Sequence, residues 1–126
     1  MPYLQLDLPF VVPAGRRPEL AARLAAVYAD VMDTVPHVVT VAFRELGENG
    51  VLRNTEAGVV PAVVVGCDIR RGRAPEVRLE LGHRVAALIE EALGWPRDGV
   101  ILEFTQHSGD EIYREGRLSE DWEPGH

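Results

Sequence analysis

The order strand, helix, strand occurs twice along the 126 residues, and this repeat constrains the fold more than any other feature. Residues 3–8 alternate apolar and polar side chains, as a strand with one buried face does. Apolar residues recur at three- and four-residue steps from Pro18, which predicts a helix that Pro36 ends. Residues 37–43 are rich in β-branched side chains and predict a second strand. The first unit therefore spans about residues 2–46.

The second unit spans about residues 61–105. Residues 62–69 form a nearly continuous apolar run, which is typical of an interior strand. An amphipathic helix is predicted over residues 75–93, and Gly94 ends it. Residues 99–104 predict the last strand.

Two units of this kind predict an α+β fold with a four-stranded sheet and two helices on one face. The whole chain, residues 1–126, is expected to be a single domain. Residues 51–60 between the units predict a loop or a short hairpin, and residues 106–126 an irregular polar tail. The second sheet face is left bare and partly apolar, so we expect oligomerisation to cover it.

Composition excludes several classes of function. A net charge of −7 argues against general nucleic-acid binding, and no apolar run is long enough to span a membrane. All 13 basic residues are arginines, which excludes a lysine Schiff base and a lysine phosphate loop. The histidines lack zinc-ligand spacing, and the single Cys67 is typical of a reducing compartment. We therefore expect a cytoplasmic protein that needs neither metal nor cofactor.

Pro2 is the sharpest candidate for chemistry. Removal of Met1 would leave a free secondary amine, and a buried amine near cations is neutral enough at pH 7 to accept a proton. The predicted strand begins directly after Pro2, which would hold the amine in place. The alternative is that this proline only discourages strand pairing.

Arg70 and Arg73 follow the third strand, directly before a helix, where α/β units usually bind small ligands. Two guanidinium groups there can hold a carboxylate through charge-assisted hydrogen bonds. The alternative interpretation is a solvated turn.

Together these residues resemble the tautomerase superfamily, and within it the cis-3-chloroacrylic acid dehalogenase-like group. The resemblance covers the start of the chain, both units, and the runs Ile69-Arg70-Arg71-Gly72-Arg73, Leu102-Glu103-Phe104 and Glu115-Gly116-Arg117. It implies that Pro2 is the catalytic base, that Arg70 and Arg73 bind the substrate, and that the protein is a homotrimer.

The sequence departs from that group at three positions. Tyr28 and Ala29 stand where the dehalogenases carry a histidine, and Glu103 stands where they carry a tyrosine. Arg114 aligns with their water-activating glutamate, with Glu115 one residue away. We interpret Tyr28 and Arg114 as candidate substrate-binding residues, although core packing is the alternative for Tyr28.

Glu103 shares a strand face with Ile101, so it is a second acid/base candidate if that face lines the site, and otherwise an exposed glutamate. The predicted activity is cofactor-independent tautomerisation or isomerisation of a small carboxylate-bearing substrate. Two alternatives stay open: a hydratase, dehalogenase or decarboxylase of substituted acrylates, and an inactive oligomeric binding module.

Overall fold

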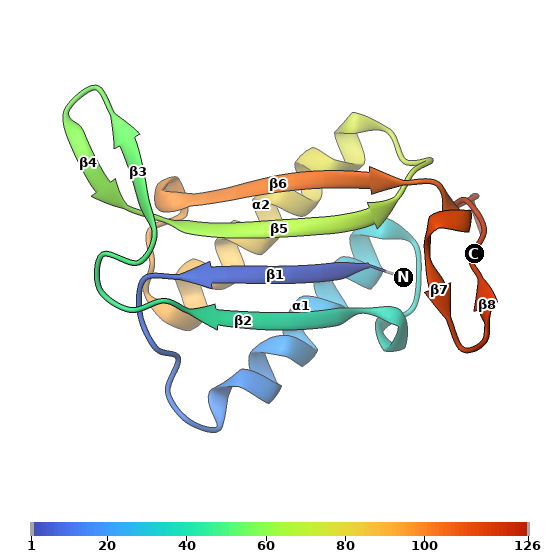
Figure 1. Ribbon diagram of the computed structural model, residues 1–126, viewed down its shortest axis with the longest axis horizontal. Coiled ribbons are helices and arrows are strands. Elements are labelled where there is room, and N and C mark those ends of the chain that lie inside the picture. The colour runs from blue at the N-terminus through green and yellow to red at the C-terminus, as the bar shows by residue number, and fades with distance from the viewer. Residues whose placement is uncertain (1, 126) are drawn as a thin grey trace.

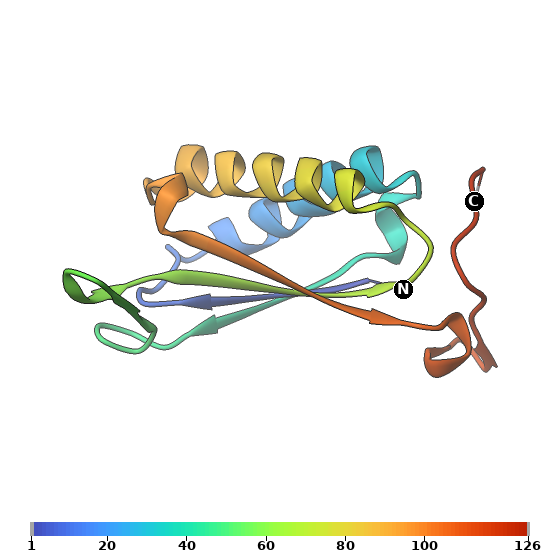
Figure 2. The same ribbon diagram turned by 90° about the horizontal axis from the view of Figure 1, so that it is seen from above.

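The computed structural model describes residues 2–125 and contains both predicted units (Figure 1). The first consists of β1 (Tyr3–Leu8), α1 (Arg16–Met32) and β2 (Thr40–Glu45). The second consists of β5 (Val63–Arg70), α2 (Pro75–Leu93) and β6 (Val100–His107). The predicted α+β architecture is confirmed: four strands form one sheet, and both helices lie on the same face of it (Figure 2).

The sheet order is β2-β1-β5-β6. Strands within each unit are parallel, whereas β1 and β5, which join the units, are antiparallel. The carboxyl end of β5 therefore lies beside the amino end of β1, where Tyr3 is opposite Asp68. Because β1 and β5 are antiparallel, the start of β1, which Pro2 precedes, lies beside the end of β5 at Arg70. The predicted site residues therefore lie at one edge of the fold.

Alternation along the central strands separates the core from the bare face. Leu4, Leu6 and Leu8 of β1 are completely buried under the helices. The intervening positions of β1 are only half-buried and face the other side. In β5 the buried positions alternate in the same way, and the core is completed by Leu20, Leu24, Met32, Leu81, Val85 and Ile89 of the helices.

The first helix and the second strand differ from the sequence prediction in their bounds. α1 begins at Arg16, which places Pro18 in its first turn, where the missing proline N–H costs no hydrogen bond. A short 3₁₀ turn, η1 (Pro36–Val38), occupies the predicted start of the second strand. It forms because the backbone N–H groups of Val38 and Val39 donate to the carbonyls three residues earlier. β2 therefore begins only at Thr40.

Residues 51–60, predicted as a loop or hairpin, form a hairpin of β3 (Leu52–Thr55) and β4 (Gly58–Pro61). The hairpin projects from the end of the sheet opposite the chain's amino end (Figure 1). The Thr55 hydroxyl donates a 2.7 Å hydrogen bond to the carbonyl of Gly58 and closes the turn.

The prediction of an irregular tail was wrong. β6 extends to His107, and the chain then forms a 3₁₀ turn, η3 (Gly109–Glu111), and a small hairpin of β7 (Tyr113–Arg114) and β8 (Arg117–Leu118). The remaining segment runs beside the end of the sheet where β1 begins (Figures 1 and 2). No helix within residues 2–125 is both long and apolar enough to cross a membrane.

Candidate active site

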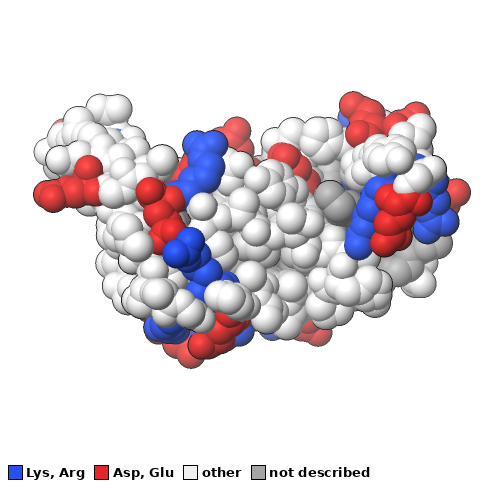
Figure 3. Space-filling view, turned by 60° about the horizontal axis from the view of Figure 1, so that its bottom comes forward, with Lys and Arg blue, Asp and Glu red and all other residues white. Residues whose placement is uncertain are grey.

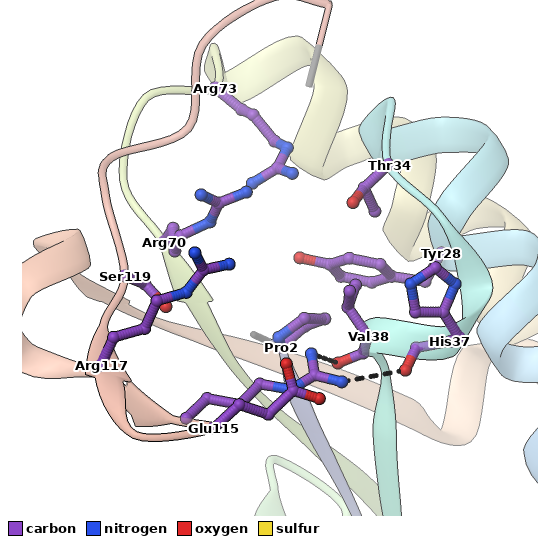
Figure 4. Close-up of a pocket in the computed structure, with 11 residues that line it drawn as sticks. Pro2, Tyr28, Thr34, His37, Val38, Arg70, Arg73, Glu115, Arg117 and Ser119 are labelled. Atoms are coloured by element: carbon purple, nitrogen blue, oxygen red, sulfur yellow. Dashed lines mark hydrogen bonds between the residues drawn. The ribbon is translucent and has the colours of Figure 1, made fainter.

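A cavity of about 260 Å³ lies where β1 begins, β5 ends and the C-terminal hairpin closes the edge of the sheet. Its walls come from both units and from the tail (Figure 4). The lining residues are Pro2, Tyr28, Thr34, His37, Val38, Arg70, Arg73, Arg114, Glu115, Arg117 and Ser119. Five of the six predicted site residues, all except Glu103, thus meet in one place.

Pro2 is buried and lies in the middle of the cavity (Figure 4). Its carbonyl accepts a 3.1 Å hydrogen bond from the backbone N–H of Thr40, which fixes it against the start of β2. Pro2 is therefore held by the sheet.

Arg73 is the most constrained cation of the site. Only 7% of this residue is exposed, and its Nε donates a 2.8 Å hydrogen bond to the carbonyl of Met32. Its Nη1 is buried and has no hydrogen-bond partner within the described residues. Burial lowers the pKa of the Arg73 guanidinium, and the neighbouring Arg70 lowers it further, whereas Tyr28 and Asp33 act in the opposite direction. A buried cation with a free donor is costly unless an anion approaches it, so Arg73 marks an anion site.

Arg70 is the last residue of β5 and points into the same cavity (Figure 4). Its Nη1 donates a 2.8 Å hydrogen bond to the carbonyl of Glu120 in the tail. The guanidinium has five N–H donors, so others remain for a ligand, and Arg70 and Arg73 can share one carboxylate.

Tyr28 reaches the cavity from α1, and its hydroxyl points toward the arginines (Figure 4). The residue is 1% exposed, and burial raises the pKa of its phenol to about 12 against the opposing effect of Arg73. The hydroxyl makes no hydrogen bond to the other residues drawn in Figure 4. Tyr28 is thus a neutral phenol whose donor is available to a ligand; its buried ring also packs in the core.

The C-terminal hairpin supplies two more arginines. Arg114 and Arg117 are directly opposite each other across β7 and β8, joined by a two-residue turn in which Glu115 and Gly116 have φ of 53° and 82°. Arg114 donates hydrogen bonds to the carbonyls of His37 and Val38 at 3.2 and 3.5 Å. Like charges directly opposite each other destabilise a strand pair, and an anion in the cavity would relieve that repulsion.

Glu103 lies outside this site. It is exposed on β6, opposite Gly66 of β5, while Leu102 and Phe104 pack against the core. Alternation predicted its face correctly, but that face is the bare side of the sheet. Within one chain, Glu103 does not meet Pro2.

The sequence prediction did not assign roles to five lining residues: Thr34, His37, Val38, Arg117 and Ser119. Thr34, His37 and Val38 follow α1, where no periodic signal marks them, and of these only His37 and Val38 lie in the stretch predicted as strand. Arg117 lies in the Glu115-Gly116-Arg117 run, and Gly116, a residue that favours positive-φ turns, is a signal that could have indicated the hairpin. Within residues 2–125, no group of three or more potential His, Cys, Asp or Glu ligands could hold a metal ion.

The cavity is positive although the chain is acidic. Four arginines and one glutamate line it, in a protein with a net charge of −7. On the face shown in Figure 3, blue and red atoms form one group at the right end and a second band in the left half, with a largely uncharged area between them. A small anion is therefore the ligand that the electrostatics favour.

No protein-family model and no curated protein matches this sequence. Solved structures do match its fold. The crystal structure of N1, a member of the cis-3-chloroacrylic acid dehalogenase family, has a TM-score of 0.82 and 20% identity and covers 98% of this chain and 85% of that one. The structure of Pt0534 inactivated by 2-oxo-3-pentynoate has a TM-score of 0.78 and 18% identity, covering 93% and 94%. Leishmania major MIF2 has a TM-score of 0.74 and 19% identity, covering 94% and 97%. The tautomerase-like fold predicted from the resemblance is confirmed.

Proposed function

We propose that the protein is a cofactor-independent tautomerase or isomerase of the tautomerase superfamily, acting on a small carboxylate-bearing keto or enol substrate. The observation that carries the proposal is the position of Pro2. It is buried and lines the same cavity as Arg73, whose Nη1 has no hydrogen-bond partner within residues 2–125. The candidate base Pro2 and the two arginines of the proposed anion clamp, Arg70 and Arg73, thus line the same small cavity.

The proposed base is the secondary amine that Pro2 offers once Met1 has been removed. Free α-amino groups titrate at about 7.7–8.0, and burial and adjacent cations both disfavour the charged form. Pro2 is buried and shares its cavity with four arginines, so a neutral amine at pH 7 follows. This amine accepts the proton from the carbon next to the substrate carbonyl and returns it to a different atom of the enolate.

Arg70 and Arg73 hold the carboxylate and stabilise the charge that develops on the enolate oxygen. The Tyr28 phenol donates an additional hydrogen bond, and Arg114 supports the wall opposite. Removing one such donor from a preorganised site costs about 100-fold or more in rate. We assign no step to Glu103, which lies on the other sheet face.

The decisive experiment combines intact mass with turnover. The expected mass lacks one methionine, and the purified protein then interconverts the enol and keto forms of a pyruvate-type substrate. Pro2→Ala is the test variant, with its own mass checked for methionine removal. Retention of Met1, or unchanged turnover in Pro2→Ala, would overturn the proposed base.

A chemical probe tests the same amine independently. The solved structure of Pt0534 was inactivated by 2-oxo-3-pentynoate, an acetylenic 2-oxo acid to which an amine can add. We expect one molecule of this reagent to attach at Pro2 and abolish turnover. Peptide mapping that places the adduct elsewhere, or no adduct, contradicts a reactive Pro2.

A second reading is hydration, dehalogenation or decarboxylation of a substituted acrylate. One observation favours it: the carboxylate of Glu115 lines the cavity and could activate water. Tyr28 stands where the dehalogenases have a histidine, which is why tautomerisation ranks first. Halide release or formation of a 3-oxo acid from a 3-haloacrylate would identify this chemistry, whereas anion binding without any turnover would indicate a binding module.

We extend the proposal to assembly and location. Residues of the bare sheet face, among them Tyr3, Val64 and Ile101, are half-buried and available to a partner. A homotrimer, as the resemblance implies, would cover this face, and the single Cys67 favours the cytoplasm as its location. Light scattering that gives the mass of a monomer would contradict the trimer.

A further inference from the structure

The end of the tail contacts the arginine clamp directly. The guanidinium carbon Cζ of Arg73 lies 4.6 Å from the centroid of a Trp122 ring, in cation–π contact. The Trp122 indole N–H donates a 3.2 Å hydrogen bond to the carbonyl of Asp33, the residue that caps α1. The tryptophan is thereby fixed to the same helix end that binds Arg73 Nε through Met32.

The backbone of the clamp is shaped to accept this tryptophan. The backbone N–H of Trp122 donates a 3.3 Å hydrogen bond to the backbone carbonyl of Arg71. Gly72 has a φ of 129°, and a Cβ added to it would lie 2.6 Å from the Trp122 carbonyl oxygen. The close approach therefore requires glycine between the two arginines of the loop.

We propose that Trp122 is a positioning residue for Arg73, an inference that rests on the proposed anion clamp. The ring covers one face of the guanidinium and keeps water from it, while Met32 fixes Nε. Arg73 lines the cavity and its buried Nη1 has no hydrogen-bond partner within residues 2–125, so this donor is left for a ligand. The Arg73 guanidinium is then already desolvated and oriented before a substrate carboxylate binds. Binding therefore costs less side-chain conformational entropy.

The test measures binding of maleate, a small unreactive carboxylate, by titration calorimetry. Trp122→Leu keeps an apolar cover and removes the π face; we expect maleate binding to weaken by about 3- to 30-fold. Trp122→Phe keeps a π face, and we expect affinity within about threefold of the wild type. The matched control is Tyr113→Leu, an aromatic in the same tail that is 72% exposed, which should leave the affinity unchanged.

Thermal unfolding of each variant separates positioning from folding. If Trp122→Leu binds maleate as tightly as Trp122→Phe, the tryptophan is only an apolar cover and the proposal is wrong. Maleate binding needs no free amine at Pro2, so this result stands whether or not the protein turns over an enol substrate. Complete absence of maleate binding in the wild type would reject the clamp itself.

Fluorescence gives a second readout, because the chain has two tryptophans. Trp95 packs on Phe10 with ring centroids 5.5 Å apart, whereas Trp122 contacts Arg73, which lines the cavity. In Trp95→Phe, all tryptophan emission comes from Trp122, and maleate should change it. In Trp122→Phe, the emission of Trp95 should not respond; equal responses in both variants would overturn the assignment.

Discussion

Arg73 Nε donates a 2.8 Å hydrogen bond to the backbone carbonyl of Met32, the last residue of α1. The last carbonyls of a helix have no partner within the helix, so this bond joins the first unit to the loop that begins the second helix. Nη1 of the same side chain has no hydrogen-bond partner within residues 2–125. Arg73 is therefore placed for a structural role and for the ligand binding that we propose.

Arg73→Ala should consequently lose stability and binding together. Loss of a buried hydrogen bond from a charged donor costs about 2 kcal/mol in the free energy of unfolding. Arg70→Ala is the matched control, because Arg70 is half-buried and its hydrogen bond to the backbone carbonyl of the tail residue Glu120 is exposed. We expect it to weaken maleate binding with less than about 1 kcal/mol of destabilisation. Urea unfolding and calorimetry measure the two effects; equal destabilisation by both variants would contradict the dual role.

Tyr28→Phe removes one hydroxyl and leaves the ring in the core. Because the pKa of this phenol is raised to about 12, it is a neutral hydrogen-bond donor at neutral pH. We expect turnover to fall by about 10- to 100-fold with little change in melting temperature. The acid limb of the pH–rate profile should stay in place, since the proposed Pro2 amine sets it. A shift of that limb in Tyr28→Phe would assign the titration to the tyrosine.

The main helices and strands could be predicted because their signals are local. Leu4, Leu6 and Leu8 alternate along β1, and Gly94 ends α2 with a φ of 71°. Pro2, Arg70 and Arg73 could be grouped only through the resemblance, because the antiparallel pairing of β1 and β5 that joins them is a long-range contact. Sequence patterns carry no record of such pairings.

Other parts of the site were beyond reach for the same reason. Glu103 was placed on the correct strand face, yet nothing in the chain tells which sheet face or edge holds the cavity. The wall formed by His37 and Val38 depends on hydrogen bonds from Arg114, 76 and 77 positions away. Trp122 is positioned by hydrogen bonds to Asp33 and Arg71. Hydrophobic periodicity in the sequence does not predict such contacts.

Two buried acids predict that the protein loses stability in alkali. Burial raises the pKa of the Cys67 thiol from 9.0 to about 12 and that of the Tyr28 phenol from 10.0 to about 12. Between these values the unfolded chain has released protons that the folded chain keeps, so the free energy of unfolding falls as pH rises. At about 1.36 kcal/mol for each unit of pKa, the thiol accounts for about 4 kcal/mol at most and the phenol for about 3 kcal/mol at most. Urea unfolding from pH 8 to 11 should show a smaller slope in Cys67→Ala than in the wild type; identical slopes would rule out the buried thiol as a cause.

Gly116→Ala should damage the site while sparing the core. Gly116 has a φ of 82° in the turn between Arg114 and Arg117, and alanine in that region costs about 1 kcal/mol or more. The strain falls on the β7–β8 hairpin, in which four residues pair. None of these residues belongs to the hydrophobic core. We expect weaker maleate binding and an unchanged midpoint of global urea unfolding. A drop in that midpoint larger than in Arg73→Ala would show that the hairpin belongs to the cooperative core.

Glu115→Asn distinguishes the two catalytic readings. Asparagine tolerates the positive φ of 53° at this position, so the turn is kept while the carboxylate is removed. Loss of a negative charge from the cavity should tighten maleate binding by about two- to fivefold. Tautomerisation that depends on the Pro2 amine should persist within about threefold, because an amide at Glu115 leaves the base and the clamp in place. Any hydration of a 3-haloacrylate should instead disappear, since it requires a carboxylate to activate water. Parallel assays of both reactions on the same protein decide the matter: a loss of tautomerisation beyond tenfold would place Glu115 in the proton-transfer step.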